Sequence, residues 1–161
     1  MKKDPETLAA ARQIFNTAKV LRGQHVSMAT CGPDGAPNVA PIGSMRVVDE
    51  NTVHVLQGFL HQSFKNLERN PKAAFSICVR PKVLDLLRAS KEKDDTPMGY
   101  QIYGELTRMD DSQEAVEREC RLIGSRIPFL LRRPFLRFLR KNLKRLLTFR
   151  ITGVRVIGVP S

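Results

Sequence analysis

The chain has 161 residues, of which 42% are hydrophobic and none is Trp, and it carries a formal net charge of +11. A chain of this length fits one domain, which we expect to span residues 1–161 and to bury roughly two thirds of its unfolded surface. Its three cysteines form no CxxC or Cys/His cluster, which argues against a disulfide framework and against a zinc site.

The N-terminal segment is charged and lacks the apolar core that a signal peptide needs, and no apolar run approaches the ~20 residues of a membrane span. We therefore expect a cytoplasmic protein. Cys31 and Cys78 fall in apolar segments that we expect to form strands, so both are expected to be buried thiols.

The predicted elements are a first helix, several strands with short turns, and two further helical segments before a last strand. The first helix is expected over 5–21, where apolar residues recur at helical spacing. Asp34-Gly35 predicts a tight hairpin turn, because glycine tolerates a positive φ. Strands are expected at 24–31, 36–49, 52–59, 73–79, 98–109 and 149–159, a surface excursion at 81–97, and a helix at 110–123. Strands that do not alternate regularly with helices favour a barrel over a doubly wound sheet.

The end of the strand at 52–59 carries the first functional clue. Residues 61–63 are polar and lead into a short helix, 64–69, for which Ser63 is the expected N-cap. The first turn of a helix presents unpaired N–H groups and the positive end of the helix dipole, so with Lys65 close behind it could hold a phosphate. The alternative is a capped surface helix that only joins two strands, and spacing alone leaves both open.

The stretch 29–71 resembles the FMN-binding split-barrel family, which includes pyridoxamine 5′-phosphate oxidase, small bacterial FMN-binding proteins and flavin reductases. The resemblance rests on the order of several short motifs: A-T-x-G-x-D-G from Ala29, P-I-G-S from Pro41, L-Q-G from Leu56, H-Q-S from His61, N-L-x-x-N-P from Asn66, and G-Y-Q-I-Y-G-E-L from Gly99. It implies a six-stranded antiparallel Greek-key split barrel that forms a homodimer, with FMN bound at the subunit interface.

The resemblance also implies which residues would hold FMN. Residues 42–44 would lie along the flavin, 57–58 near its ribityl chain or ring edge, and 61–63 at its phosphate. The implied cofactor site comprises Ile42, Gly43, Ser44, Gln57, Gly58, His61, Gln62, Ser63, Lys65 and Asn66. Family members often carry Lys or Arg where this chain has Gln62. A neutral amide loses the charge-assisted hydrogen bond, so Lys65 or a basic residue of 126–150 would have to supply the charge.

Other catalytic arrangements are not recognisable. No Ser-His-Asp set and no pair of carboxylates can be assembled from spacing, so any chemistry would be carried by the flavin. His25 and His54 fall in predicted strands and are expected to be structural, whereas His61 is expected to be a binding contact. The arginine and histidine pattern that binds substrate in the oxidase is absent near the C-terminus, so pyridoxamine phosphate is not assigned as the substrate.

The segment 126–150 carries nine basic residues and no acidic one. Pro134 suits the first position of a helix, which is expected to continue to about residue 148 with an apolar stripe formed by Phe135, Phe138, Leu139, Leu143, Leu146 and Leu147. Three interpretations are open: a helix packed on the barrel, a helix lying on a membrane surface, or a basic funnel that attracts an anion. Nucleic-acid binding is disfavoured, because the segment has no Tyr or Trp on which bases could stack.

Two functional hypotheses follow. The first is an FMN-binding homodimer that acts as an oxidoreductase on an unidentified substrate. The second is a non-enzymatic barrel that binds haem or a deazaflavin and whose basic helix docks to a membrane or to an acidic partner.

Overall fold

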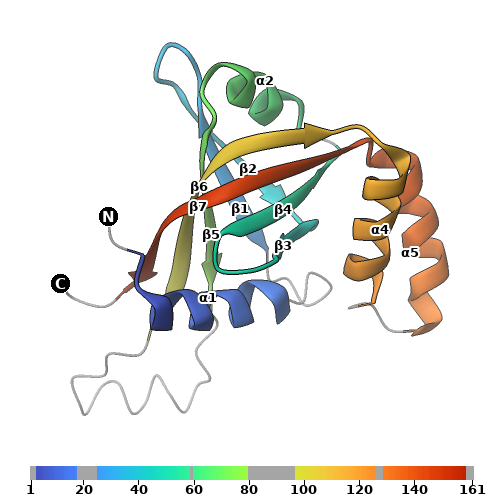
Figure 1. Ribbon diagram of the computed structural model, residues 1–161, viewed down its shortest axis with the longest axis horizontal. Helices are drawn as coiled ribbons and strands as arrows, with labels where there is room; N and C mark the ends of the chain where they lie inside the picture. The colour runs from blue at the N-terminus through green and yellow to red at the C-terminus, as the bar shows by residue number, and fades with distance from the viewer. Residues whose placement is uncertain (1–2, 18–24, 59, 80–96, 126–128, 159–161) are drawn as a thin grey trace.

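The structure, a computed structural model, describes residues 3–17, 25–58, 60–79, 97–125 and 129–158. Seven strands form one antiparallel sheet in the order β2-β1-β5-β6-β7-β4-β3 (Figure 1). Their bounds are Val26–Cys31 (β1), Pro37–Ile42 (β2), Met45–Val47 (β3), Thr52–Gln57 (β4), Lys72–Cys78 (β5), Gly99–Asp110 (β6) and Arg145–Ile157 (β7).

The two edge strands of this sheet, β2 and β3, follow one another in the chain. Ile42 is the last residue that pairs with β1, and Met45 is the first that pairs with β4. The chain therefore crosses from one edge of the curled sheet to the other within two residues. This arrangement confirms the predicted antiparallel split barrel. The strand expected at 36–49 is divided at this crossing, which gives seven strands in place of six.

Strands β6 and β7 form a long antiparallel pair, although α4 and α5 lie between them in the chain. The register of this pair shifts beside Gly104, where an added Cβ would lie 3.2 Å from Cβ of Phe149 and 3.4 Å from the ring of Phe75. Those two rings pack edge to face with their centroids 5.1 Å apart. A glycine at this position therefore lets the strand pass close to the largest side chains of the core.

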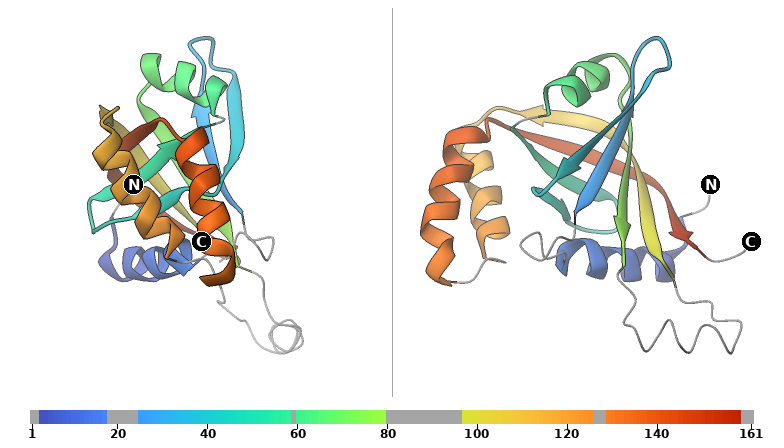
Figure 2. Two further views of the ribbon diagram at one scale, coloured as in Figure 1. Left: turned by 90° about the vertical axis from the view of Figure 1, so that its right-hand side faces the viewer. Right: turned by 180° about the vertical axis from the view of Figure 1, so that it is seen from behind.

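Helix α1 (Pro5–Thr17) closes one end of the barrel (Figures 1 and 2). Its apolar face points into the barrel core, where Leu8, Ala11 and Phe15 are all at most 3% exposed. This confirms the predicted helical spacing. Residues 18–21, the end of the expected helix, lie outside the described residues.

The other helices of the described residues lie outside the barrel. Helix α2 (His61–Arg69) sits over the hairpin of β1 and β2, and α4 (Gln113–Gly124) and α5 (Phe129–Asn142) form a hairpin beside β4 and β7 (Figure 2). A second apolar core fills the space between this helical hairpin and the outer face of the sheet: Leu56, Ala115, Val116, Cys120, Ile123, Leu139, Leu143 and Leu146.

The structure corrects the expected helix in the basic segment. Helix α5 begins before Pro134, which lies inside the helix, and it ends at Asn142 rather than near residue 148. Leu146 and Leu147 belong to β7, where the first packs in the outer core and the second in the barrel core. Successive strand residues point to opposite faces, so two neighbouring leucines can both be buried without a helical stripe.

Smaller expectations also changed. Both Cys31 and Cys78 were expected to be buried. Cys78 is exposed at the end of β5, so this expectation is wrong for Cys78, and Cys31 is only half-buried. His25 lies exposed just before β1 rather than in the strand. Most of the expected surface excursion, residues 81–96, lies outside the described residues. Within the described part of the chain, no helix is long and apolar enough to cross a membrane.

Candidate functional site

The start of α2 has the features of an anion-binding helix end. The helix begins at His61 with Leu60 as its N-cap, three residues earlier than the expected start. Leu60 has no side-chain acceptor, so the N-cap provides no partner for the N–H groups of the first turn. The dipole of the helix favours negative charge at this end. Ser63, the expected cap, lies in the third helical position instead.

A buried polar network fixes α2 on the β1–β2 hairpin. The Asn38 amide donates to Oγ of Ser63 (2.8 Å) and to Oγ1 of Thr30 (3.2 Å). The Asn66 amide also donates to Oγ1 of Thr30 (3.2 Å), and the Gln62 amide donates to Oδ1 of Asn66 (2.9 Å). Ser63, Asn66 and Thr30 are all at most 5% exposed. This network explains why Ser63 does not cap the helix: its hydroxyl is engaged with β2.

The structure divides the expected phosphate contacts into two groups. His61, Gln62 and Lys65 are exposed on the first turns of α2. His61 and Lys65 are four residues apart, so their side chains lie on one face of the helix. Ser63 and Asn66 lie beneath them and anchor the helix. The exposed group is available to a ligand, whereas the buried group sets the position of the helix.

Residues 42–44 form the crossing between the two edges of the sheet. Ile42 is 4% exposed and packs in the barrel core. The Ser44 hydroxyl donates to the Leu56 carbonyl (2.8 Å), and the Leu56 N–H donates back to the Ser44 carbonyl (3.2 Å). The side chains of Ile42 and Ser44 are thus turned inward, and Gly43 is the exposed residue of the three.

Gln57 and Gly58 lie at the end of β4, next to the end of α5. The Gln57 carbonyl accepts a hydrogen bond from the Lys144 N–H (3.0 Å). An added Cβ on Gly58 would lie 2.6 Å from Cδ2 of Leu143 and 3.2 Å from the carbonyl oxygen of Asn142. Gly58 therefore allows the end of α5 to approach the strand, a role that the sequence analysis did not assign to it.

Arg145 is a further cation beside α2, which the sequence analysis counted only as part of the basic segment. Its guanidinium lies 4.8 Å from the centroid of the Phe64 ring. The Asp111 carboxylate accepts two hydrogen bonds from it, one of them with Nη2 and Oδ2 2.8 Å apart. The hydrogen bond to Asp111 raises the pKa of Arg145 and lowers the pKa of Asp111. No short-range spacing predicts this cluster, since its members come from three distant segments.

A buried ion cluster joins α4 to the outer face of the sheet. Glu119 is 2% exposed and accepts two hydrogen bonds from Arg46 of β3, at 2.5 and 2.8 Å. Nδ1 of His54, on β4, lies 3.0 Å from the same carboxylate. Burial alone would raise the pKa of Glu119, but the hydrogen bonds from Arg46 and His54 outweigh it and lower that pKa to about 2. His54 thus lies in β4, a strand as expected, and its ring is part of this cluster.

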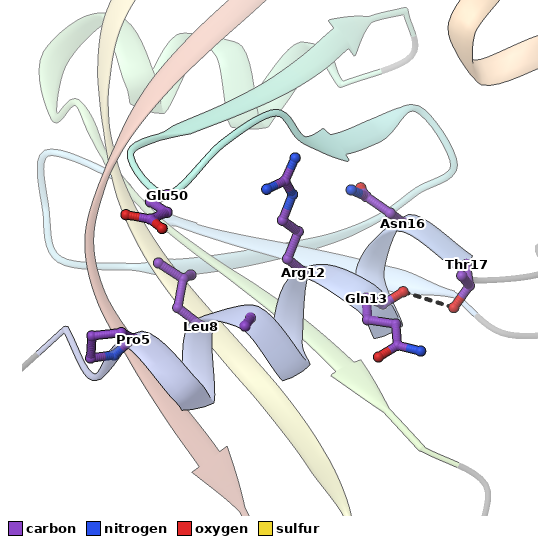
Figure 3. A pocket seen from close by; sticks show the side chains of 8 residues that line it. Pro5, Leu8, Arg12, Gln13, Asn16, Thr17 and Glu50 are labelled. Carbon is purple, nitrogen blue, oxygen red and sulfur yellow. Dashed lines mark hydrogen bonds between the residues drawn. The ribbon is translucent and has the colours of Figure 1, made fainter.

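A surface hollow of about 390 Å³ lies beside α1 (Figure 3). Arg12, in its lining, donates to the Val48 carbonyl (2.6 Å). Figure 1 shows α1 and α2 at opposite ends of the barrel, so this hollow is not part of the site at α2. Among the described residues, no group of three or more His, Cys, Asp or Glu side chains is placed to hold a metal ion.

Comparison with known proteins supports the resemblance seen in the sequence. A family model described as pyridoxamine 5′-phosphate oxidase matches residues 16–157. A curated relative, an uncharacterised protein of Methanocaldococcus jannaschii, is 35% identical over 60 residues. That match covers 36% of this chain and 40% of the relative, so it spans less than half the length of either protein.

Solved structures of low sequence identity share the fold. An FMN-binding protein from Syntrophomonas wolfei subsp. wolfei has a TM-score of 0.69 and 19% identity, over 98% of this chain and 90% of its own. HutZ, the haem storage protein of Vibrio cholerae, has a TM-score of 0.55 and 19% identity, over 99% of this chain and 97% of its own. At such identities the similarity shows the fold alone.

Proposed function

The chain belongs to the pyridoxamine 5′-phosphate oxidase family, and we propose that it is a cytoplasmic, homodimeric FMN-binding flavoprotein with oxidoreductase activity on a substrate still to be identified. The observation that carries the proposal is the start of α2, which has no side-chain cap and leaves His61, Gln62 and Lys65 exposed. FMN supplies hydride and electron transfer when bound, while the protein supplies position and electrostatics.

In this proposal the phosphate of FMN lies against the first turn of α2. The N–H groups of that turn would donate to its oxygens, and the Lys65 ammonium would supply the positive charge that Gln62 lacks. The exposed backbone at Gly43 and the Gln57 side chain would lie along the rest of the flavin. Ser63 and Asn66 would act by holding α2 in place through their hydrogen bonds to Asn38 and Thr30. The other proposed residues would shape the backbone around the site: Ile42, Ser44 and Gly58.

The test separates the phosphate contact from the rest of the site. Replacing Lys65 with Ala should weaken FMN binding about tenfold, equal to about 1.4 kcal/mol, because one charge-assisted hydrogen bond is lost. Riboflavin, which lacks the phosphate, should bind the variant as well as it binds the wild type. The matched control is Arg69→Ala, which removes an exposed cation from the last turn of the same helix. Flavin fluorescence titration measures the affinities of the wild type, the Lys65 variant and the Arg69 variant for FMN and for riboflavin.

Two results would contradict the phosphate assignment. One is unchanged FMN affinity in the Lys65 variant, and the other is an equal loss for FMN and riboflavin. A folded wild-type protein that retains no flavin after dialysis would contradict the flavoprotein proposal as a whole.

A second candidate function is haem binding by the same barrel without catalysis. It is favoured by the similarity to HutZ, which extends over 99% of the chain, and by His61, whose imidazole is exposed and is a common iron ligand. The same purified protein distinguishes the two candidates. A Soret band that survives gel filtration after haem is added, together with loss of added FMN, would favour the haem function.

A further inference from the structure

Helix α5 presents a strongly basic surface to solvent. It carries Arg132, Arg133, Arg137, Arg140 and Lys141, and no acidic residue. All of these except the half-buried Arg132 are exposed, and the exposed Lys144 follows shortly after the end of the helix. These cations are not needed to hold the helix in place, because apolar contacts on its other side pack it on α4 and the sheet.

Four of the five cations occupy one side of the helix, whereas the half-buried Arg132 donates to the Ser125 carbonyl beside the end of α4. At 100° per residue, Arg133, Arg137 and Lys141 fall within an arc of roughly 80°, and Arg140 lies beside them. The buried residues Leu139 and Leu143 lie roughly 110–150° away from the centre of this arc and pack in the core shared with α4. Phe138 lies at the border of the basic arc and is 53% exposed. Solvent therefore meets a basic helix face with a large aromatic side chain at its edge.

We propose that this face of α5 docks on an anionic membrane surface, with the helix lying parallel to the bilayer. Clusters of Lys and Arg on a helix surface are attracted to anionic lipids, and an exposed aromatic side chain beside them adds an apolar contact with the interface. The 14 residues of α5 extend roughly 21 Å, too short for a span, and no described helix is able to cross a bilayer. Lipid phosphates and carboxylates would pair with the cations, and Phe138 would enter the headgroup region.

The neighbouring helix shows that this surface is particular to α5. Helix α4 has two basic residues, Arg118 and Arg121, and three acidic ones, Glu114, Glu117 and Glu119. Glu119 is buried and paired, which leaves the surface of α4 balanced in charge. An anionic surface would therefore attract α5 and not α4. Duplex nucleic acid would also be attracted by the charges, but it offers no apolar layer for Phe138.

The absence of Trp from the sequence provides a direct test. Phe138→Trp places a single fluorophore on the docking face, and Val39→Trp places one on β2, where the native side chain is 65% exposed. Each variant is mixed with phosphatidylcholine vesicles, with or without phosphatidylserine. We expect a blue-shifted emission for Phe138→Trp on the phosphatidylserine vesicles only, and no shift for Val39→Trp.

A second pair of variants tests the charges. Arg137→Gln with Lys141→Gln should lower the vesicle partition coefficient roughly 25-fold at low salt, since each cation near an anionic bilayer contributes a factor of about 5. The control pair, Lys72→Gln with Arg155→Gln, removes the same charge from exposed positions on β5 and β7 and should change binding little. Far-UV circular dichroism confirms that both pairs are folded.

Several results would overturn the proposal. Equal losses for the two charge pairs would mean that overall charge, and not this face, drives binding. Co-sedimentation without a Trp shift would mean that Phe138 does not enter the lipid. Tighter binding to duplex RNA than to the anionic vesicles, with the same dependence on Arg137 and Lys141, would assign the face to nucleic acid instead. None of these results bears on FMN binding, which is measured separately.

Discussion

At the scale of single residues, the sequence predicts what depends on near neighbours. Gly35 adopts φ of 81° in the hairpin turn, as the Asp-Gly pair indicated. Glu119 shows the limit of such reasoning, because nothing next to it in the chain marks it as buried. Its partners are Arg46 and His54, 73 and 65 residues away, and only the folded sheet brings them to α4.

We predict that Glu119→Gln destabilises the protein by about 3 kcal/mol. The neutral amide cannot compensate the positive charge of the Arg46 guanidinium, which the Glu119 carboxylate pairs with in the wild type. The control is Glu114→Gln, which removes an exposed carboxylate from the same helix and should cost little. Urea unfolding of the two variants measures the difference. Similar values for both would show that the buried pair contributes no more than a surface charge.

The same carboxylate predicts a pH dependence. The pKa of Glu119 is about 2 in the folded protein against an ordinary value of 4.5, so the unfolded chain binds the proton more tightly. Its stabilisation of about 3 kcal/mol is complete above about pH 4.5 and is lost as the pH falls towards 2. The difference in stability between wild type and Glu119→Gln should therefore shrink over this range. A constant difference would argue against the ionised cluster.

At the scale of whole elements, predictions fail where a distant contact outweighs a local preference. Ser63 is a good N-cap by type, yet its hydroxyl bonds to Asn38 on β2, and α2 starts earlier at His61. Pro134 suits a helix start, yet Leu136 and Leu139 pack on α4, and the helix extends through the proline. In contrast, the end of α2 at Asn70-Pro71 needs no distant contact and was predicted correctly.

Helix α1 shows how one element protects another. The Asn16 amide donates to the Val47 carbonyl (2.8 Å), and its oxygen accepts from the Val47 N–H (2.9 Å). Val47 lies on the edge strand β3, so this side chain occupies backbone groups that would otherwise be open to another strand.

We predict that Asn16→Asp weakens the attachment of α1 by about 1–2 kcal/mol, because a carboxylate accepts from the Val47 N–H but repels the Val47 carbonyl. Gln13→Glu adds the same charge at an exposed position on the same helix and serves as the control. Amide hydrogen exchange at β3 reports the effect locally. Unchanged protection of Val47 in the Asn16 variant would contradict the proposed role.

At the scale of the whole molecule, the order of short motifs predicts the fold better than it predicts the site. The split barrel follows from strand order and spacing, which many residues specify together. The residues at α2 and β4 are each fixed by a few contacts. Residue type alone does not show that Asn66 is buried while Lys65 is exposed, because that depends on which face of α2 meets β1.

The last prediction concerns the proposed homodimer. His61, Gln62, Lys65 and Gly43 are exposed in a single chain, so a flavin held by them would keep much of its surface in water. Bound cofactors usually bury most of their surface. We therefore expect a second protomer to cover the flavin, and FMN affinity should then depend on dimer formation.

FMN binding and dimer formation are thermodynamically linked, so the effect of each on the other can be measured. Dilution below the dimer dissociation constant should weaken FMN binding, and saturating FMN should strengthen dimerisation by the same factor. Sedimentation velocity with and without FMN, alongside flavin titrations at several protein concentrations, measures both effects. If two protomers each contact the flavin, a separated protomer loses part of those contacts and must bind FMN more weakly than the dimer does. A monomer that binds FMN as tightly as the dimer would therefore place the whole cofactor site within one chain.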